Sequence, residues 1–361
     1  MNIQWLKPGT SPKLLPVILA LVLGVLGVGS VASAQEDPID VVWVRGPIYM
    51  LAGAGGNIMA SIGPDGVLLV DSGTAEMADA VLETIAQIQI MQLEGRAYAW
   101  AGIENWGAEG RLSVLAYRDG YAPPKPVRYI LNTSADPDHS GGNQIIKDSG
   151  ITYVGGNVAG SIQDAGVGAA IYAREEVLFR MLEDGLPFEM FPTDTFYGDS
   201  YKLSHFFNGD GVKMVHMPSS TTDATVVYFP RSDIIVTGDF FSQTRYPIVD
   251  LENGGSIDGV IDALNWVLDT AIPEFRSEGG TLVIPGHGRV SDTADVGYYR
   301  DMVTIVRNNI QEMINRGWTL DEVLAERPTK GYDGLYGDDR TWTPTDFVTA
   351  VYRSLVEGRG E

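Results

Sequence analysis

Carboxylates and an imidazole are concentrated in one short segment of the chain, Asn132-Thr-Ser-Ala-Asp-Pro-Asp-His-Ser-Gly-Gly-Asn143. Asp136, Asp138 and His139 are residue types that ligate divalent metals and carry protons in catalysis. The chain contains no cysteine, so thiolate ligands and disulfides are excluded. Imidazole ligands can come from four histidines, which are His139, His205, His216 and His287.

The strands that position these side chains are predicted by β-branched or alternating runs bounded by turn residues. They are expected at residues 41–44, 48–51, 57–62, 67–70, 128–131, 201–207, 212–217, 226–229, 234–237 and 281–284. Apolar residues at helical spacing predict helices over 75–88, 141–147, 257–268, 296–314 and 344–355, the last capped by Thr343.

The order of these elements predicts the fold class. The strands form two blocks, each followed by helices, which favours two sheets packed face to face with helices outside. We therefore expect an α+β protein, an αββα four-layer sandwich of two mixed β-sheets, as one domain over residues 35–316. Residues 317–361 are expected to form a C-terminal helical extension.

Composition narrows the class of partner. The 361 residues are 44% apolar, which is ample for a large core. The net charge of −22 repels phosphate backbones, so nucleic acid is not expected as a partner. We expect a small-molecule substrate, whose identity no residue pattern marks.

Residues 1–34 have the organisation of a signal peptide. Lys7 and Lys13 precede an apolar run from Leu14 to Gly29, and Ala32-Ser-Ala34 is a small-residue cleavage site. We expect export to the periplasm or the medium, with no membrane attachment after cleavage. The alternative is an uncleaved N-terminal membrane anchor, because the apolar run approaches membrane-spanning length.

An aromatic-rich insertion is expected at residues 93–126, just before the strand at 128–131. It contains Tyr98, Trp100, Trp106 and Tyr121. Two interpretations remain open, a packed surface excursion that buries its own aromatic rings and a lid over the site.

Four separated segments resemble the metallo-β-lactamase superfamily in order and spacing, over about residues 40–316. Val67-Leu-Leu-Val-Asp-Ser-Gly73 resembles its early strand and turn, and residues 132–143 resemble its metal loop, Thr-His-x-His-x-Asp-His-x-Gly-Gly-Asn. Val236-Thr-Gly-Asp-Phe240 resembles the strand that delivers a bridging aspartate, and Ile284-Pro-Gly-His-Gly288 resembles the loop with the last histidine. The resemblance implies the αββα fold, with a site at one edge of the sandwich.

The family binds two metal ions, each with its own ligand set, and only one of the two sets is complete in this chain. The first ligand set, three histidines in the family, is replaced by Ser134, Asp136 and Thr221, or by Ser220 if the alignment shifts by one residue. The second ligand set is complete in the resemblance, and consists of Asp138, His139, Asp239 and His287. Two imidazoles and two carboxylates suit Zn²⁺ and can also hold Fe²⁺ or Mn²⁺. The resemblance thus implies one divalent ion, and Ser134→His, Asp136→His and Thr221→His together are expected to raise the capacity toward two.

Three further polar residues lie near the predicted site, and two of them have competing interpretations. The resemblance gives Asp71 a structural role, in which its hydrogen bonds anchor the metal loop. For Asp136 three interpretations remain open: a solvated loop carboxylate, a general base, or a substitute metal ligand. His216 lies on a strand that runs toward residues 218–223, and it is either a structural histidine or a replacement ligand.

These observations lead to three functional hypotheses. The first is a degenerate hydrolase in which a single divalent ion activates water, with Asp138 or Asp136 taking the proton. The alternative is a non-catalytic exported binding or scaffold protein, descended from such a hydrolase, that uses the former active-site cleft. The third, an iron-dependent oxidative enzyme, is disfavoured because relatives with that chemistry keep the histidine pairs that are missing here.

Overall fold

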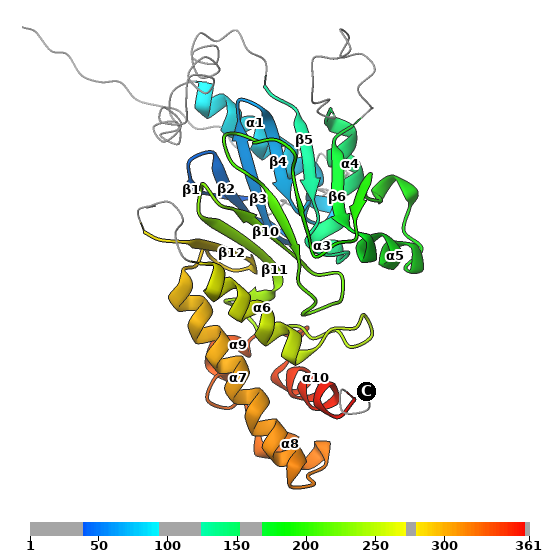
Figure 1. The fold of residues 1–361 in the computed structure, drawn as a ribbon, viewed down its shortest axis with the longest axis vertical. Coiled ribbons are helices and arrows are strands. Elements are labelled where there is room, and N and C mark those ends of the chain that lie inside the picture. Colours follow the sequence, from blue (N-terminus) through cyan, green and yellow to red (C-terminus); the bar gives the residue numbers. More distant parts are fainter. Residues whose placement is uncertain (1–38, 94–123, 152–167, 272–278, 358–361) are drawn as a thin grey trace, which may run out of the picture. The chain divides into compact units, whose positions relative to one another are not determined.

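The computed structural model describes residues 39–93, 124–151, 168–271 and 279–357 (Figure 1). The predictions of a signal peptide over 1–34 and of a lid or excursion within 93–126 concern residues that lie wholly or mostly outside the described ranges. Within the described ranges, no helix is both long enough and apolar enough to cross a membrane.

The first sheet has seven strands that lie side by side in sequence order. They are β1 (Asp40–Arg45), β2 (Ile48–Ala54), β3 (Gly56–Gly63), β4 (Gly66–Val70), β5 (Val127–Leu131), β6 (Ala170–Arg174) and β7 (Asp194–Phe196). Pairing is antiparallel from β1 to β4 and parallel from β4 to β7. Because β4, β5 and β6 are parallel, the segments that follow them all start at the same edge of the sheet.

The second sheet has five strands in the order β12-β11-β10-β9-β8. They are β8 (Ser200–Lys202), β9 (Lys213–His216), β10 (Thr225–Phe229), β11 (Ile234–Ser242) and β12 (Leu282–His287). Only the β11–β12 pair is parallel among these neighbours. Asp239 on β11 and His287 at the end of β12 are therefore delivered to one edge of this sheet.

Three apolar cores stack the elements into four layers. The core between the sheets contains Met59, Leu68, Phe229 and Ile284. Helices α1 (Ala78–Leu93) and α4 (Asn143–Ser149) contribute to the core on the outer face of the first sheet. The core on the outer face of the second sheet draws on α6 (Ile257–Thr270), α7 (Thr293–Asn315), α8 (Leu320–Glu326) and α10 (Pro344–Glu357). The predicted αββα sandwich is thus confirmed (Figure 1).

The C-terminal helices belong to that last core. Phe347 of α10 is fully buried and stacks on Tyr246, with ring centroids 4.7 Å apart. The Thr343 hydroxyl accepts a hydrogen bond from Asp346 N at 3.3 Å, so the predicted cap of α10 is present. The remaining helical segments are short: η1 (Ala75–Met77), α3 (Pro137–Ser140), α5 (Glu175–Glu183), η4 (Phe188–Met190) and α9 (Asp333–Tyr336).

The strand expected over 201–207 is wrong in length, because β8 ends at Lys202. Asn208 and Gly209 adopt left-handed φ values of 48° and 83°, which close a tight turn between Phe207 and Asp210. The Asn208 side chain then donates to Ser61 O and Gly66 O in the other sheet, at 3.2 and 3.1 Å. These contacts between the sheets hold the chain away from the β8 ladder.

Candidate metal centre

Asp71 anchors the metal loop, as predicted. It follows β4 with a left-handed φ of 65° and is buried. Its Oδ1 accepts from Thr133 N at 2.7 Å, and its Oδ2 accepts from Thr133 Oγ1 at 2.7 Å and lies 2.7 Å from His139 Nδ1. The cost of the unusual backbone conformation is offset by these three buried contacts.

His139 lies on α3 and is fully buried. Because Nδ1 donates to the Asp71 carboxylate, the lone pair of the neutral ring, the form that binds a metal, is on Nε2. This Nε2 lies 3.1 Å from Asp239 Oδ1, yet neither atom has a hydrogen-bond partner within the described part of the chain. Buried polar atoms are rarely left unpaired. Two such atoms facing each other are what a shared cation requires.

His287 and Asp138 complete the group. His287 Nε2 is 3.1 Å from Asp138 Oδ2 and 3.4 Å from Asp239 Oδ1. One ligand atom from each of the four side chains lies within 4.8 Å of the other three. The structure therefore brings the second ligand set together from α3, β11 and β12, and its donor atoms fit a divalent ion.

The electrostatics of this group favour a cation. Burial opposes the charge on Asp239, but His139 and His287 outweigh it and hold the pKa of Asp239 well below its usual range. Burial likewise disfavours a charged His139, but Asp71 and Asp239 raise its pKa well above the usual value. In the absence of a metal, the carboxylates thus favour a protonated imidazole, and a metal ion would displace that proton.

Glycine at position 286 lets β12 approach the Asp239 carboxylate. A Cβ atom at Gly286 would lie 2.2 Å from Asp239 Oδ1 and 2.8 Å from Gly238 C. Any larger residue must therefore displace a ligand atom.

The positions of the first ligand set contain an ion pair that the sequence analysis missed. Arg180 of α5 donates from Nη2 to Asp136 Oδ1 at 2.6 Å, and Ser134 Oγ donates to Asp136 Oδ2 at 2.9 Å. Arg180 also lies 3.6 Å from Asp223 Oδ1 and 3.9 Å from Asp250 Oδ2. Burial opposes its charge, but these carboxylates raise the pKa of Arg180. Burial also raises the pKa of Asp136, and Arg180 counteracts that rise.

A second arginine pairs with an aspartate of the second ligand set. Arg245 Nη2 donates to Asp239 Oδ2 at 2.9 Å, and its Nη1 lies 3.8 Å from Asp339 Oδ2. The two oxygens of Asp239 therefore face different partners, Oδ1 the histidines and Oδ2 a guanidinium. The loop carboxylates around the lost histidines were a signal in the sequence that a cation lies there, but they do not indicate which residue supplies it.

The remaining two histidines bond elsewhere. His216 Nε2 lies 2.7 Å from Thr222 O, as expected of a structural histidine. His205 Nε2 lies 3.4 Å from the Tyr129 hydroxyl. Neither takes the place of a lost ligand.

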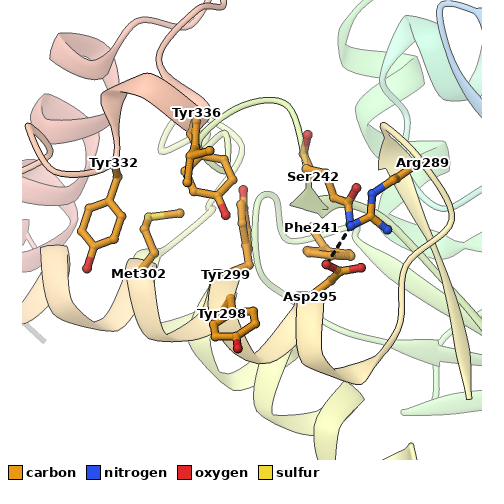
Figure 2. A pocket seen from close by; sticks show the side chains of 11 residues that line it. Phe241, Ser242, Arg289, Asp295, Tyr298, Tyr299, Met302, Tyr332 and Tyr336 are labelled. Carbon is orange, nitrogen blue, oxygen red and sulfur yellow. Dashed lines mark hydrogen bonds and ion pairs between the residues drawn. The ribbon is translucent and has the colours of Figure 1, made fainter. Parts of the chain in front are cut away.

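Two pockets differ in position and chemistry. A pocket of about 170 Å³ at the centre is lined by Asp136, Pro137, Asp138, Ser220, Thr221, Asp239, Arg245, Ile248 and Asp250. A larger pocket of about 460 Å³ is lined by aromatic residues of α7 and of the α9 region, with the Arg289–Asp295 ion pair at 2.9 Å at one end (Figure 2). None of the four side chains of the second ligand set lines the larger pocket.

Comparison with known proteins agrees with this fold. A family model described as the metallo-beta-lactamase superfamily matches residues 54–287. The chain is similar to the structure of the stereoselective inverting sec-alkylsulfatase Pisa1 from Pseudomonas sp., with a TM-score of 0.56 and 15% identity over 87% of this chain and 50% of that chain. It is also similar to the metallo-β-lactamase DIM-1, with a TM-score of 0.47 and 16% identity over 74% of this chain and 98% of that chain.

The reach of these similarities is limited to architecture. The chain spans about half the length of the alkylsulfatase, with a coverage of 50%. At 15% identity the likeness extends to the fold alone. No curated protein sequence matches the chain.

Proposed function

The chain belongs to the metallo-β-lactamase superfamily, and from this premise we propose that it is a hydrolase that works with one divalent ion. The observation that carries the proposal is the convergence of Asp138, His139, Asp239 and His287. When bound, the ion supplies Lewis acidity and lowers the pKa of water to about 7. Zn²⁺ is the ion we propose, with Fe²⁺ and Mn²⁺ as alternatives for the same donor set.

The hydrogen bonds support Asp138 as the proton acceptor. Both oxygens of Asp136 are engaged, one by Arg180 and the other by Ser134. Asp138 lines the small pocket and contacts His287 through Oδ2. We therefore assign proton transfer to Asp138 and give Asp136 a structural part, which narrows the choice that the sequence left open.

The pocket supports a small polar reacting group. With about 170 Å³ and four aspartates and an arginine among its lining residues, it suits the hydrolysable head of a substrate better than a bulky apolar body. Sulfate esters belong in the first substrate panel because of the fold shared with an alkylsulfatase. Phosphate esters, thioesters, lactones and β-lactams complete the panel.

Elemental analysis joined to a hydrolysis screen tests the proposal. We expect one tightly held ion after dialysis against Zn²⁺, and hydrolysis that Asp138→Asn abolishes and His205→Ala leaves intact. No bound ion would refute the proposal. One ion without hydrolysis of any substrate would favour the alternative, an exported binding protein.

Export is a separate proposal, supported by residues 1–34 of the sequence. We expect cleavage after Ala34, which the intact mass of the exported protein measures. A chain that keeps these residues in the membrane fraction would favour an N-terminal anchor.

A further inference from the structure

The lost ligand set leaves a surplus of negative charge that needs an explanation. Asp136, Asp223 and Asp250 converge from three loops, after β5, before β10 and after β11. Carboxylates that gather around one point repel one another unless a cation lies among them. In a centre with two metal ions, the ion of the first ligand set would supply that cation.

The structure supplies guanidinium groups instead. Arg180 reaches all three carboxylates, at 2.6, 3.6 and 3.9 Å, and its side chain is only 15% exposed. Arg245 holds the oxygen of Asp239 that faces away from the histidines, and is 13% exposed. An ordinary helical ion pair on this protein, Arg316 with Glu312, leaves its arginine 62% exposed.

We propose that Arg180 and Arg245 replace the charge of the missing metal ion and close the first position to any ion. An ion there would have to displace the guanidinium N–H groups from Asp136 and from Asp239 Oδ2. It would also lie close to two fixed positive charges, which repel it. The centre is then restricted to one ion by its arginines as well as by its missing histidines.

This proposal changes the outcome expected for restored ligands. The variant that combines Ser134→His, Asp136→His and Thr221→His, here the triple-histidine variant, is expected to keep one ion. Arg180 still lies beside Asp223 and Asp250 in it, and Arg245 still holds Asp239. Adding Arg180→Met and Arg245→Met removes both charges at nearly constant side-chain volume, and is expected to admit a second ion.

The test is a count of Zn²⁺ ions by elemental analysis after dialysis, with affinities from competition against a chromophoric chelator. We expect one ion in the triple-histidine variant, two in the variant that also lacks Arg180 and Arg245, and at least a tenfold gain in affinity for the second ion. The matched control adds Arg307→Met and Arg316→Met to the triple-histidine variant, which removes the same charge from exposed ion pairs with Asp258 and Glu312. It is expected to bind one ion.

Three results would overturn the proposal. These are two tightly held ions in the triple-histidine variant, one ion when both centre arginines are absent, or a second ion in the charge-matched control. The ion of the second ligand set serves as a folding check, because an unfolded variant loses it as well. The count is independent of hydrolysis, so a failed substrate screen would leave this proposal standing.

Discussion

The two halves of the centre offset carboxylate charge in different ways. In one half, two histidines and two aspartates turn ring nitrogens and carboxylate oxygens toward a common point. Among the described residues, His139 Nε2 and Asp239 Oδ1 are left there without a hydrogen-bond partner. In the other half, Arg180 pairs with Asp136 and needs no ion. The comparison teaches that the histidine ligands of a metal ion can be lost while the charge of the nearby carboxylates stays balanced, because an arginine reaches the same carboxylates.

Loss of an imidazole from the first of these halves should have the largest effect. His287→Ala removes one of two nitrogen donors, so we expect the Zn²⁺ affinity to fall by more than about 100-fold, the upper end for outer-shell partners. Competition with a chelator measures it. His205→Ala is the control, because His205 lies outside the ligand cluster. An equal loss of Zn²⁺ affinity in this control would show that the effect of His287→Ala is not specific to the cluster.

Asp71→Asn should have the next largest effect, although Asp71 is not a ligand. Asparagine tolerates the left-handed backbone of this position, but its amide donates toward His139 Nδ1. The proton is then forced onto Nε2, so we expect Zn²⁺ to bind about 10- to 100-fold more weakly. The control is Asp210→Asn, a buried aspartate that accepts from Arg231 N and Ser232 N. That change is expected to lower stability and to leave Zn²⁺ affinity unchanged.

Gly286→Ala tests how closely the neighbouring strands β11 and β12 must approach at the ligands. Because the new Cβ would meet Asp239 Oδ1, we expect the metal-free protein to lose about 1–3 kcal/mol of unfolding free energy. We also expect several-fold weaker Zn²⁺ binding. Urea unfolding measures the first effect. Gly297→Ala on α7, where a Cβ meets no atom within 4 Å, is expected to be neutral or stabilising.

The smallest effect on Zn²⁺ affinity is expected for Asp136→Asn, in the half of the centre where Arg180 pairs with Asp136. Arg180 keeps Asp223 and Asp250 as neighbours, so Zn²⁺ affinity should change by less than about tenfold, the lower end for outer-shell partners. A larger loss in calorimetric titration would show that Asp136 contributes an oxygen to the ion. That result would revive its interpretation as a substitute ligand.

Most of the fold and the ligand cluster could be predicted from sequence because both depend on local signals. Buried strands such as β4 are unbroken apolar runs, and the ligands lie in short motifs at strand ends. The seven-stranded sheet was harder to predict. Its strands β6 and β7, with α5 between them, fall in a region where no strand or helix was expected, because the two strands are short and the amphipathic pattern of α5 extends over only 9 residues.

The part played by Arg180 could not be predicted because its partners are distant in sequence. Arg180 lies 44 residues from Asp136, on an amphipathic helix where an arginine normally faces solvent. Only the packing of α5 beside β6 turns it toward the loop after β5. The early end of β8 has a similar origin, since Asn208 bonds to residues more than 140 positions away.

The ion pair between Arg180 and Asp136 also bears on how the chain responds to a chelator. A metal ion exchanges with the solution, whereas a guanidinium is covalently part of the chain. Stripping the ion would therefore leave the loop after β5 tethered to α5, with the shape of the cleft preset. Such a chain can lose its ion in chelating surroundings and reload it without refolding, so that ion uptake is reversible filling of a preformed site rather than a step of folding.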